Sequence, residues 1–165
     1  DGVSVTEYMA MIEGKTAVLV SLATELGARI AGADETAVRH YAQFGLDLGL
    51  AFQVKDDILG IWGDETLTGK STATDITTKK KTLPVLYGLE QSVTLRELYT
   101  QQDIDDAFVH QVIRHLNDCG ARQFTQTKAS AYSEGSIDHL QAANPTGSAG
   151  AALHQLTEML LQRNS

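Results

Sequence analysis

The sequence predicts an all-α protein, and two observations support this fold class. Apolar residues recur at helical spacing through most of the 165 residues. No pair of alternating β-branched segments is joined by a hairpin signal. With 42% hydrophobic and 21% charged residues, the chain has the composition of a soluble globular protein with one core. Because the chain begins at Asp1 instead of methionine, we expect residues 1–165 to be a processed, trimmed or proteolysed piece of something longer.

The first two helices are predicted from their capping residues. Ser4 and Glu7 have the spacing of a capping box, so a helix is expected to start near Ser4 and to continue to about Gly32. Asp34 is predicted to cap a second helix, which runs to about Trp62. Both helices carry apolar residues at helical spacing along their whole length.

The rest of the chain predicts a long loop followed by further helices. Residues 63–82 are polar and rich in Gly and Thr, and long loops of this kind often carry function. Pro84 suits the first turn of the helix that follows the loop. The remaining expected elements, in chain order, are a helix at 104–116, a break at Cys119-Gly120, a helix at 121–143, a turn at 144–150 and a last helix ending near Arg163.

Charge and composition exclude several classes of function. A net charge of −8 argues against a nucleic-acid partner, because phosphate contacts need a concentrated positive surface. The single cysteine, Cys119, excludes an intramolecular disulfide and fits a reducing cytosol. No apolar run reaches the ~18 to 20 residues that a membrane span requires, so no integral membrane segment is expected. The five histidines show no metal-binding spacing.

The stretch "FQVKDDILGIWGD" places Asp56 and Asp57 in an otherwise apolar helical run. A buried carboxylate is strongly unfavourable unless it is paired or bound to a metal, and two adjacent ones repel each other. A hard cation resolves both problems, and oxygen ligands of this kind suit Mg²⁺, which also takes phosphate oxygens and water. The alternative is that the pair lies at an exposed helix end.

Glycines mark one face of the same helix. Gly45, Gly49 and Gln53 follow one another at four-residue spacing, and Gly60 continues the stripe. A glycine inside a helix costs about 1 kcal/mol relative to alanine, so a neighbour is expected to need the room. That neighbour is either another helix or a ligand.

Lysines add the opposite charge. Lys15 projects from an apolar helix face and is expected to be buried, where it would need an anion. Lys70 and Asp75 lie in the predicted loop, and the run Lys79 to Lys81 precedes the helix at Pro84. Cations oppose the dipole at a helix N-terminus, so the run makes sense if an anion lies between it and the helix end. Together these residues suggest a diphosphate held by Mg²⁺ and ammonium groups.

In this order, the pieces "YMAMIEGKT", "FGLDLGLAFQVKDDILGIWGD" and "TGKSTATDITTKKKTLP" resemble the C-terminal half of the trans-isoprenyl diphosphate synthases, in particular bacterial geranylgeranyl and polyprenyl diphosphate synthases. The resemblance spans almost the whole chain. It implies an isoprenoid-synthase-type helical bundle, of which residues 1–165 are the C-terminal part. It also implies a Mg²⁺-dependent prenyltransferase that condenses isopentenyl diphosphate with an allylic diphosphate, and a cytoplasmic dimer.

The resemblance assigns roles to individual positions. The residues that it implies for the diphosphate are Lys15, Lys70 and Lys80. Those implied to face the developing allylic cation are Thr16, through its carbonyl, and Gln53. The implied Mg²⁺ ligands are Asp56 and, through water or by orienting it, Asp57. The implied supporting carboxylates are Asp75, which would hold the loop or a metal-bound water, and Asp64.

Two departures from the family pattern leave alternatives open. A third aspartate is usual where this chain has Gly60, and Asp64 is expected to substitute in part. The first aspartate-rich motif is missing from this chain. The acidic patch Asp103 to Asp106 is not expected to replace that motif; it is expected to cap the helix that follows. We therefore expect the chain to be inactive alone and to need the N-terminal half of the synthase. The alternatives are a non-catalytic partner subunit or remnant, and a class I terpene cyclase.

Overall fold

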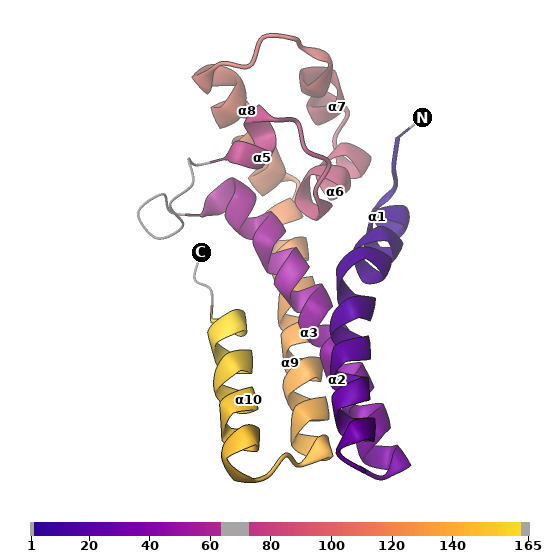
Figure 1. The fold of residues 1–165 in the computed structure, drawn as a ribbon. Coiled ribbons are helices and arrows are strands. Elements are labelled where there is room, and N and C mark those ends of the chain that lie inside the picture. Colours follow the sequence, from indigo (N-terminus) through magenta and orange to yellow (C-terminus); the bar gives the residue numbers. More distant parts are fainter. Residues whose placement is uncertain (1, 64–72, 163–165) are drawn as a thin grey trace. The chain divides into compact units, whose positions relative to one another are not determined.

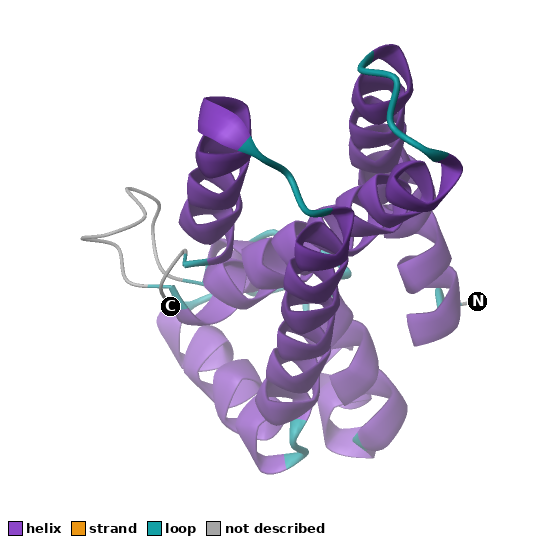
Figure 2. Ribbon diagram, turned by 90° about the horizontal axis from the view of Figure 1, so that it is seen from below, coloured by secondary structure: helices purple, strands orange, loops and turns teal. Residues whose placement is uncertain are grey.

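The computed structural model describes residues 2–63 and 73–162, and its secondary structure within these ranges is helical, without a strand (Figures 1 and 2). The predicted all-α fold class is therefore confirmed. The elements, in chain order, are α1 (Val5–Ile12), η1 (Glu13–Ala17), α2 (Val18–Ile30), α3 (Glu35–Trp62), α5 (Thr74–Thr77), α6 (Leu83–Gln91), α7 (Val93–Thr100), α8 (Asp106–Asp118), α9 (Ala121–Ala143) and α10 (Gly147–Leu161).

The first predicted helix is present, but a π-helical turn interrupts it. The predicted capping box starts α1: Glu7 N–H donates to Oγ of Ser4 at 3.2 Å, and Ser4 N–H donates to Glu7 Oε2 at 2.8 Å. In η1 the Val18 N–H bonds to the carbonyl of Glu13, five residues back. The periodicity of the sequence did not predict this turn. Single π-turns inside α-helices occur frequently at functional sites.

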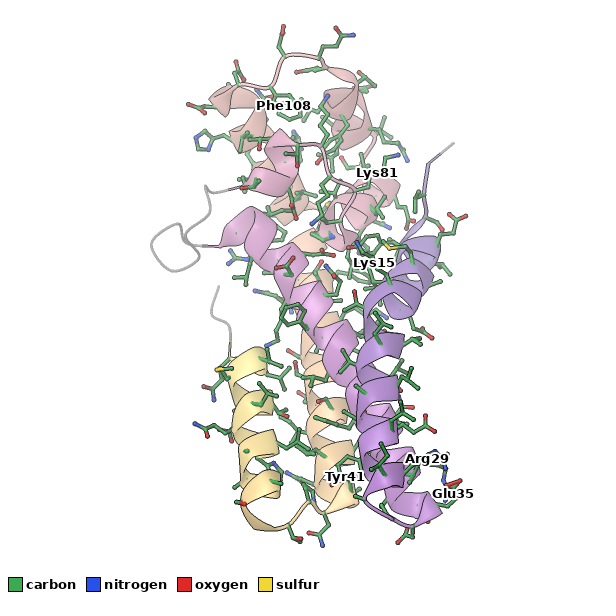
Figure 3. All side chains as sticks on the ribbon, in the orientation of Figure 1. Lys15, Arg29, Glu35, Tyr41, Lys81 and Phe108 are labelled. Atoms are coloured by element: carbon green, nitrogen blue, oxygen red, sulfur yellow. The ribbon has the colours of Figure 1, made fainter. Side chains whose placement is uncertain are left out.

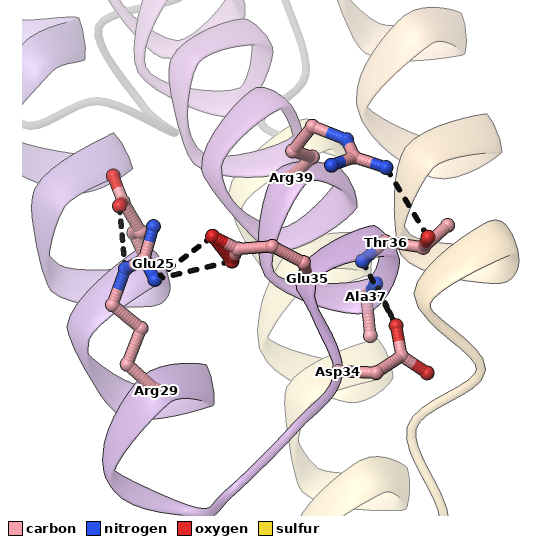
Figure 4. A network of polar contacts seen from close by, with 7 residues as sticks. All are labelled: Glu25, Arg29, Asp34, Glu35, Thr36, Ala37 and Arg39. Atoms are coloured by element: carbon pink, nitrogen blue, oxygen red, sulfur yellow. Dashed lines mark hydrogen bonds and ion pairs between the residues drawn. The ribbon is translucent and has the colours of Figure 1, made fainter.

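Local polar contacts fix the connection between α2 and α3 (Figure 4). Asp34 caps α3 as predicted, because its Oδ1 accepts from the N–H groups of Thr36 and Ala37, each at 2.9 Å. Arg29, near the end of α2, bonds Glu25 at 2.8 Å and Glu35 at 3.1 Å. These ion pairs are exposed, so each contributes little to stability.

The helices after residue 80 differ from the predictions in three places. Helix α7 was not predicted; it starts at Ser92, whose Oγ accepts from the Leu95 N–H at 3.2 Å. Helix α8 starts at Asp106 and not at 104, because Asp105 is the N-cap and accepts from the Phe108 N–H at 2.7 Å. Helix α10 already begins at Gly147, inside the predicted turn. The predicted helices α6 and α9 are present.

The chain divides into two compact units. The described residues of unit 1 are 2–9, 54–63 and 73–127, and those of unit 2 are 10–53 and 128–162. In unit 1 the core joins the end of α3 to α5, α6, α7, α8 and the start of α9. Its buried members are Ile61, Ala73, Ile76, Val85, Leu95, Leu98, Phe108, Val112, Leu116 and Ala121.

In unit 2, α3 packs closely against η1 and α2 through its glycines. A Cβ at Gly49 would lie 2.6 Å from Cα of Ala17, and a Cβ at Gly45 would lie 2.7 Å from Cα of Ser21. These distances leave no room for a side chain, so close helix packing accounts for both glycines. A cluster on α3, α9 and α10 completes the core, and its buried members are Phe44, Leu48, Ala51, Leu140 and Leu161.

Within residues 2–63 and 73–162, no helix combines the length and the apolar character needed to cross a membrane.

Candidate functional site

Asp57 is fully buried in unit 1 and takes its hydrogen bonds from the protein. Its Oδ2 accepts from the hydroxyl of Tyr8 at 2.6 Å and from the N–H of Leu83, the first residue of α6, at 3.2 Å. Burial, followed by the charge of Asp57 and its hydrogen bond, raises the pKa of Tyr8 above the usual phenol range, so Tyr8 stays a neutral donor. Asp57 thus links α1, α3 and α6.

The neighbouring carboxylate has a different environment. Asp56 is only partly buried, while Asp57 is 0% exposed. Adjacent helical residues point about 100° apart, so the two carboxylates leave α3 in different directions. The sequence predicted a largely buried pair held by a cation, with an exposed helix end as the alternative. Asp56 is the member of the pair that solvent and ligands can reach.

A second carboxylate lies beside the same stretch of α3. Asp75, on α5, is 8% exposed, and its Oδ2 lies 3.3 Å from Nζ of Lys80. The carboxylate occupies the position that a side chain at Gly60 would take, because a Cβ there would lie 2.6 Å from Cγ of Asp75. Two of the predicted residues, Asp75 and Lys80, are therefore brought together next to α3.

The lysine run does not have one common role at the start of α6. The ammonium of Lys79 donates to the carbonyls of Tyr99, at 3.2 Å, and Gln101, and it lies 5.5 Å from the ring centre of Phe108. These carbonyls belong to the C-terminal end of α7, where a cation is favourable. The expectation that all three lysines hold an anion is therefore wrong for Lys79. Lys81 is exposed (Figure 3).

Unit 2 places two other predicted residues side by side. Oγ1 of Thr16, in the π-helical turn, lies 3.4 Å from Oε1 of Gln53 on α3. Lys15, in the same turn, is exposed, so the prediction that it is buried is wrong (Figure 3). The reason is that the apolar face around it is itself uncovered. The exposed apolar residues on this face are Met11, Val18, Leu19, Leu22, Leu26 and Ile30.

Two predicted site residues, Asp64 and Lys70, lie outside the described residues. Sequence reasoning missed Tyr8 and the N–H of Leu83 as partners of Asp57. No local signal could have identified them, because Tyr8 is 49 residues from Asp57 and fits the apolar periodicity of its helix. It also missed the contact between Gly60 and Asp75, although the loss of a side chain at position 60 signals that a neighbour needs the space.

The carboxylates of unit 1 suit a hard cation that brings ligands of its own. The described ranges contain no cluster of three or more His, Cys, Asp or Glu residues able to hold a metal ion. Mg²⁺ in proteins typically binds one or two carboxylates and completes its shell with substrate phosphates and water. Asp56 and Asp75 could supply two such ligands, and the ammonium of Lys80 adds positive charge beside them.

Comparison with known proteins identifies the family. Residues 1–116 match the model of the polyprenyl synthetase family. Over 101 residues the chain is 44% identical to geranylgeranyl diphosphate synthase of Mycobacterium tuberculosis, a match that covers 59% of this chain and 29% of that protein.

Solved structures agree with this match. The polyprenyl synthetase of Streptomyces coelicolor superposes with a TM-score of 0.83 at 30% identity, covering 96% of this chain and 50% of that one. Geranylgeranyl pyrophosphate synthase of Corynebacterium glutamicum, complexed with isoprenyl diphosphate and magnesium, gives a TM-score of 0.83 at 26% identity and covers 99% of this chain and 48% of that one. The chain therefore spans about half the length of these proteins, and it belongs to the polyprenyl synthetase family.

Proposed function

We propose that this chain is the C-terminal half of a trans-isoprenyl diphosphate synthase, which condenses isopentenyl diphosphate with an allylic diphosphate and requires Mg²⁺. One observation carries the proposal. The structure of a geranylgeranyl pyrophosphate synthase complexed with isoprenyl diphosphate and magnesium superposes on this chain, and the superposition covers 99% of the chain. The carboxylates and lysines described above supply charges suited to such a ligand. The C–O bond of the allylic diphosphate breaks, isopentenyl diphosphate forms a C–C bond to the allylic carbon and loses a proton, and the leaving pyrophosphate takes that proton.

The chain's own residues divide this task. Mg²⁺, when bound, neutralises the negative charge that develops on the leaving pyrophosphate. Asp56 is the ligand within reach of solvent, and the buried Asp57 holds this part of α3 against α1 and α6. The residues that we propose to contact the diphosphate with their ammonium groups are Lys15, Lys70 and Lys80.

The developing allylic cation needs dipoles instead of full charges. We assign this role to the carbonyl of Thr16 and to the side-chain amide of Gln53, which lie together in unit 2. The π-helical turn supports the assignment, because it changes the backbone hydrogen bonding at the position of Thr16. Fixed dipoles of this kind stabilise charge in a transition state without needing to reorganise.

The partner that we propose is the N-terminal half of the same synthase domain. The solved relatives contain about as much chain again as this one. The uncovered apolar face of α1 and α2, defined above, is the kind of surface that a second part of a domain covers, because monomeric proteins rarely expose contiguous apolar patches of this kind. Covering that face would also surround Lys15 with protein. We further propose that the assembled synthase is a dimer.

The test is reconstitution. The chain is mixed with the complementary half of the Streptomyces coelicolor polyprenyl synthetase, Mg²⁺, isopentenyl diphosphate and an allylic diphosphate, and the products are separated by chain length. We expect elongated diphosphates from the mixture, none from either half alone, and none with Asp56→Ala. Asp103→Ala is the matched control, because Asp103 is exposed and lies far along the chain from the site residues.

Other outcomes favour the alternatives. A cyclised hydrocarbon formed without consumption of isopentenyl diphosphate would show a class I terpene cyclase. Absence of Mg²⁺-dependent pyrophosphate binding in any assembly would contradict catalysis and favour a non-catalytic partner subunit.

A further inference from the structure

Two histidines from distant parts of the chain meet between α3 and α9, inside unit 2. Nδ1 of His40 lies 3.2 Å from Nδ1 of His139, 99 residues further along the chain. The two ring centres are 5.5 Å apart, which is about the largest separation that this distance between the nitrogens allows. The nitrogens therefore point at each other nearly in line. A hydrogen bond needs this arrangement, whereas two ligands of one metal ion would converge on a common point.

The hydrogen bond between the two rings depends on their protonation. A neutral imidazole has one N–H donor and one acceptor nitrogen, whereas an imidazolium has two donors and no acceptor. One ring must donate its Nδ1–H and the other must accept it, so at least one of His40 and His139 is neutral while the bond exists. When both rings are charged, two N–H groups and two positive charges face each other instead.

Asp47 of α3 lies beside the same pair. Its Oδ2 is 3.9 Å from Nε2 of His139, and Nε2 of Gln43 donates to its Oδ1 at 3.3 Å. While it is charged, this carboxylate offsets part of the repulsion between two protonated rings. Burial raises the pKa of Asp47, against the opposing effects of the hydrogen bond from Gln43 and the charge of His139. As the pH falls, Asp47 therefore loses its charge earlier than an ordinary aspartate does.

Other titratable groups face this region from the helices packed around it. Tyr132 of α9 stays neutral, because burial and the charges of Asp47 and Glu13 raise its pKa. His154 lies on the buried stripe of α10 and needs a control of its own, because an ordinary histidine also titrates in mild acid. The remaining charged residues near the two ends of the pair are exposed or paired with one another, and they are Glu25, Arg29, Glu35, Arg39 and Asp138.

We propose that His40 and His139 form a pH-sensitive latch between α3 and α9, which their hydrogen bond closes near neutral pH and which opens when both rings are protonated in mild acid. Opening frees the last turns of α9 from the start of α3. The proposal is independent of the proposed function, because the latch contains none of the residues assigned to substrates or metal.

Proton counting gives the sign of the effect. In the unfolded chain the two histidines take up two protons as the pH falls through their ordinary pKa of about 6.5, whereas the closed latch takes up at most one. Stability rises with pH wherever the unfolded state binds more protons than the folded state. The latch therefore stabilises the fold above this range and loses its effect as the pH falls through it.

Asparagine at position 40 separates the hydrogen bond from the charge. Its side-chain amide places a hydrogen-bonding atom close to the place of Nδ1 but does not take up a proton in this range. Phenylalanine keeps a flat ring and removes both properties. The three residue types have similar helix propensities, so they can be compared at one position. The controls are His110→Asn, at an exposed position on α8, and His154→Asn on α10.

The experiment is a set of urea titrations of the 165-residue chain and its variants between about pH 5 and 8. Relative to His40→Asn, the folding equilibrium constant of the wild type should fall by up to about tenfold per pH unit below about pH 6.5, as a difference of one proton requires. At about pH 8, His40→Asn should match the wild type, and the constant for His40→Phe should be about 2- to 10-fold lower because the hydrogen bond is lost. Both control variants should keep the pH dependence of the wild type.

Amide hydrogen exchange tests whether the opening is local. At about pH 5 the last turns of α9 should exchange faster in the wild type than in His40→Asn, whereas the exchange rates of α8 should agree, with both proteins at the same pH. The reciprocal variant His139→Asn provides the same comparison if His40→Asn does not fold.

Three results would overturn the latch. The first is a His40→Asn variant that loses stability in acid as steeply as the wild type. The second is a His154→Asn variant that removes the pH dependence while His40→Asn keeps it, because α10 would then be the source. The third is equal exchange at the end of α9 in the wild type and His40→Asn at acid pH, because protonation would then leave this contact closed. None of these results bears on the proposed function.

Discussion

The hydroxyl of Tyr8 donates a hydrogen bond of 2.6 Å to Oδ2 of Asp57, which is completely buried. A hydrogen bond to a buried charged group contributes about 1.5–3 kcal/mol, because its loss leaves the charge without that donor. We expect Tyr8→Phe to lower the free energy of unfolding by about that amount. Denaturant titration followed by circular dichroism measures the change.

Tyr99 provides the matched control for Tyr8. Its hydroxyl is also buried in unit 1 but has no hydrogen-bond partner within the described part of the chain. Tyr99→Phe should therefore leave the free energy of unfolding unchanged or raise it. Equal losses from the two substitutions would show that the hydrogen bond to Asp57 contributes nothing specific.

The same two tyrosines predict how stability changes at alkaline pH. Burial raises the pKa of Tyr8 and of Tyr99, with Asp57 adding to the shift of Tyr8 and Asp75 to that of Tyr99. When the pKa of a group is higher in the folded than in the unfolded protein, the stability that the group contributes is complete below the unfolded pKa, which is about 10 for tyrosine. That stability is lost as the pH rises toward the pKa in the folded protein. The protein should lose stability above about pH 10. The variant with both tyrosines changed to Phe should lose less of its unfolding free energy than the wild type between about pH 9 and 11. If the unfolding free energy falls equally with pH in both proteins, the two tyrosines do not cause the alkaline loss of stability.

Asp47 in unit 2 gives a pH dependence of the same sign in a lower range. Burial raises the pKa of Asp47, while a hydrogen bond from Gln43 and the charge of His139 oppose that shift. The contribution of Asp47 to stability is complete below the ordinary aspartate pKa of about 3.9. This contribution is lost as the pH rises through the pKa of Asp47 in the folded protein. We expect Asp47→Asn to become more stable relative to the wild type as pH rises.

Urea titrations of Asp47→Asn and the wild type between about pH 4 and 8 measure this difference. The exposed Asp138 on α9 is the control, and Asp138→Asn should show a smaller dependence. A difference between Asp47→Asn and the wild type that does not change with pH would contradict the prediction.

Local features of this fold could be predicted from the sequence, and contacts between distant segments could not. The caps at Ser4 and Asp34 were correct because the capping side chain and the N–H group that it accepts from lie two or three residues apart. The contacts between Tyr8 and Asp57 and between Gly60 and Asp75 join different helices, and sequence spacing does not identify the partner residue in either contact.

The burial of Lys15 was predicted wrongly for a related reason. Helical periodicity identifies an apolar face but does not say whether this chain covers it. Here the chain leaves the apolar face of α1 and α2 exposed. The π-helical turn at Lys15 was also missed, because no pattern of three- and four-residue spacing distinguishes it from an α-helix.

The contacts of Lys79 predict a role in stability and not in ligand binding. Its ammonium bonds two carbonyls at the end of α7 and lies over the ring of Phe108. Lys79→Met keeps the apolar part of the side chain and should cost about 1 kcal/mol of unfolding free energy. Lys81→Met, at an exposed position, should cost much less. Equal effects in denaturant titrations would contradict this distinction.

The uncovered apolar face predicts how the chain associates. Leu19 on α2 is 64% exposed, and Met159 on α10 is 62% exposed, so Leu19→Ser and Met159→Ser remove similar apolar surface from different helices. Neither change should unfold the chain, because neither side chain is part of a buried core. If the complementary half covers the face that includes Leu19, Leu19→Ser should weaken its association with this chain, as seen by sedimentation of the mixture, whereas Met159→Ser should not.

Loss of a buried leucine contact typically costs about 1.5–3 kcal/mol, which corresponds to a roughly 10- to 150-fold weaker complex. Association of Leu19→Ser at wild-type strength would show that the complementary half binds elsewhere, and the exposure of this face would then need another partner.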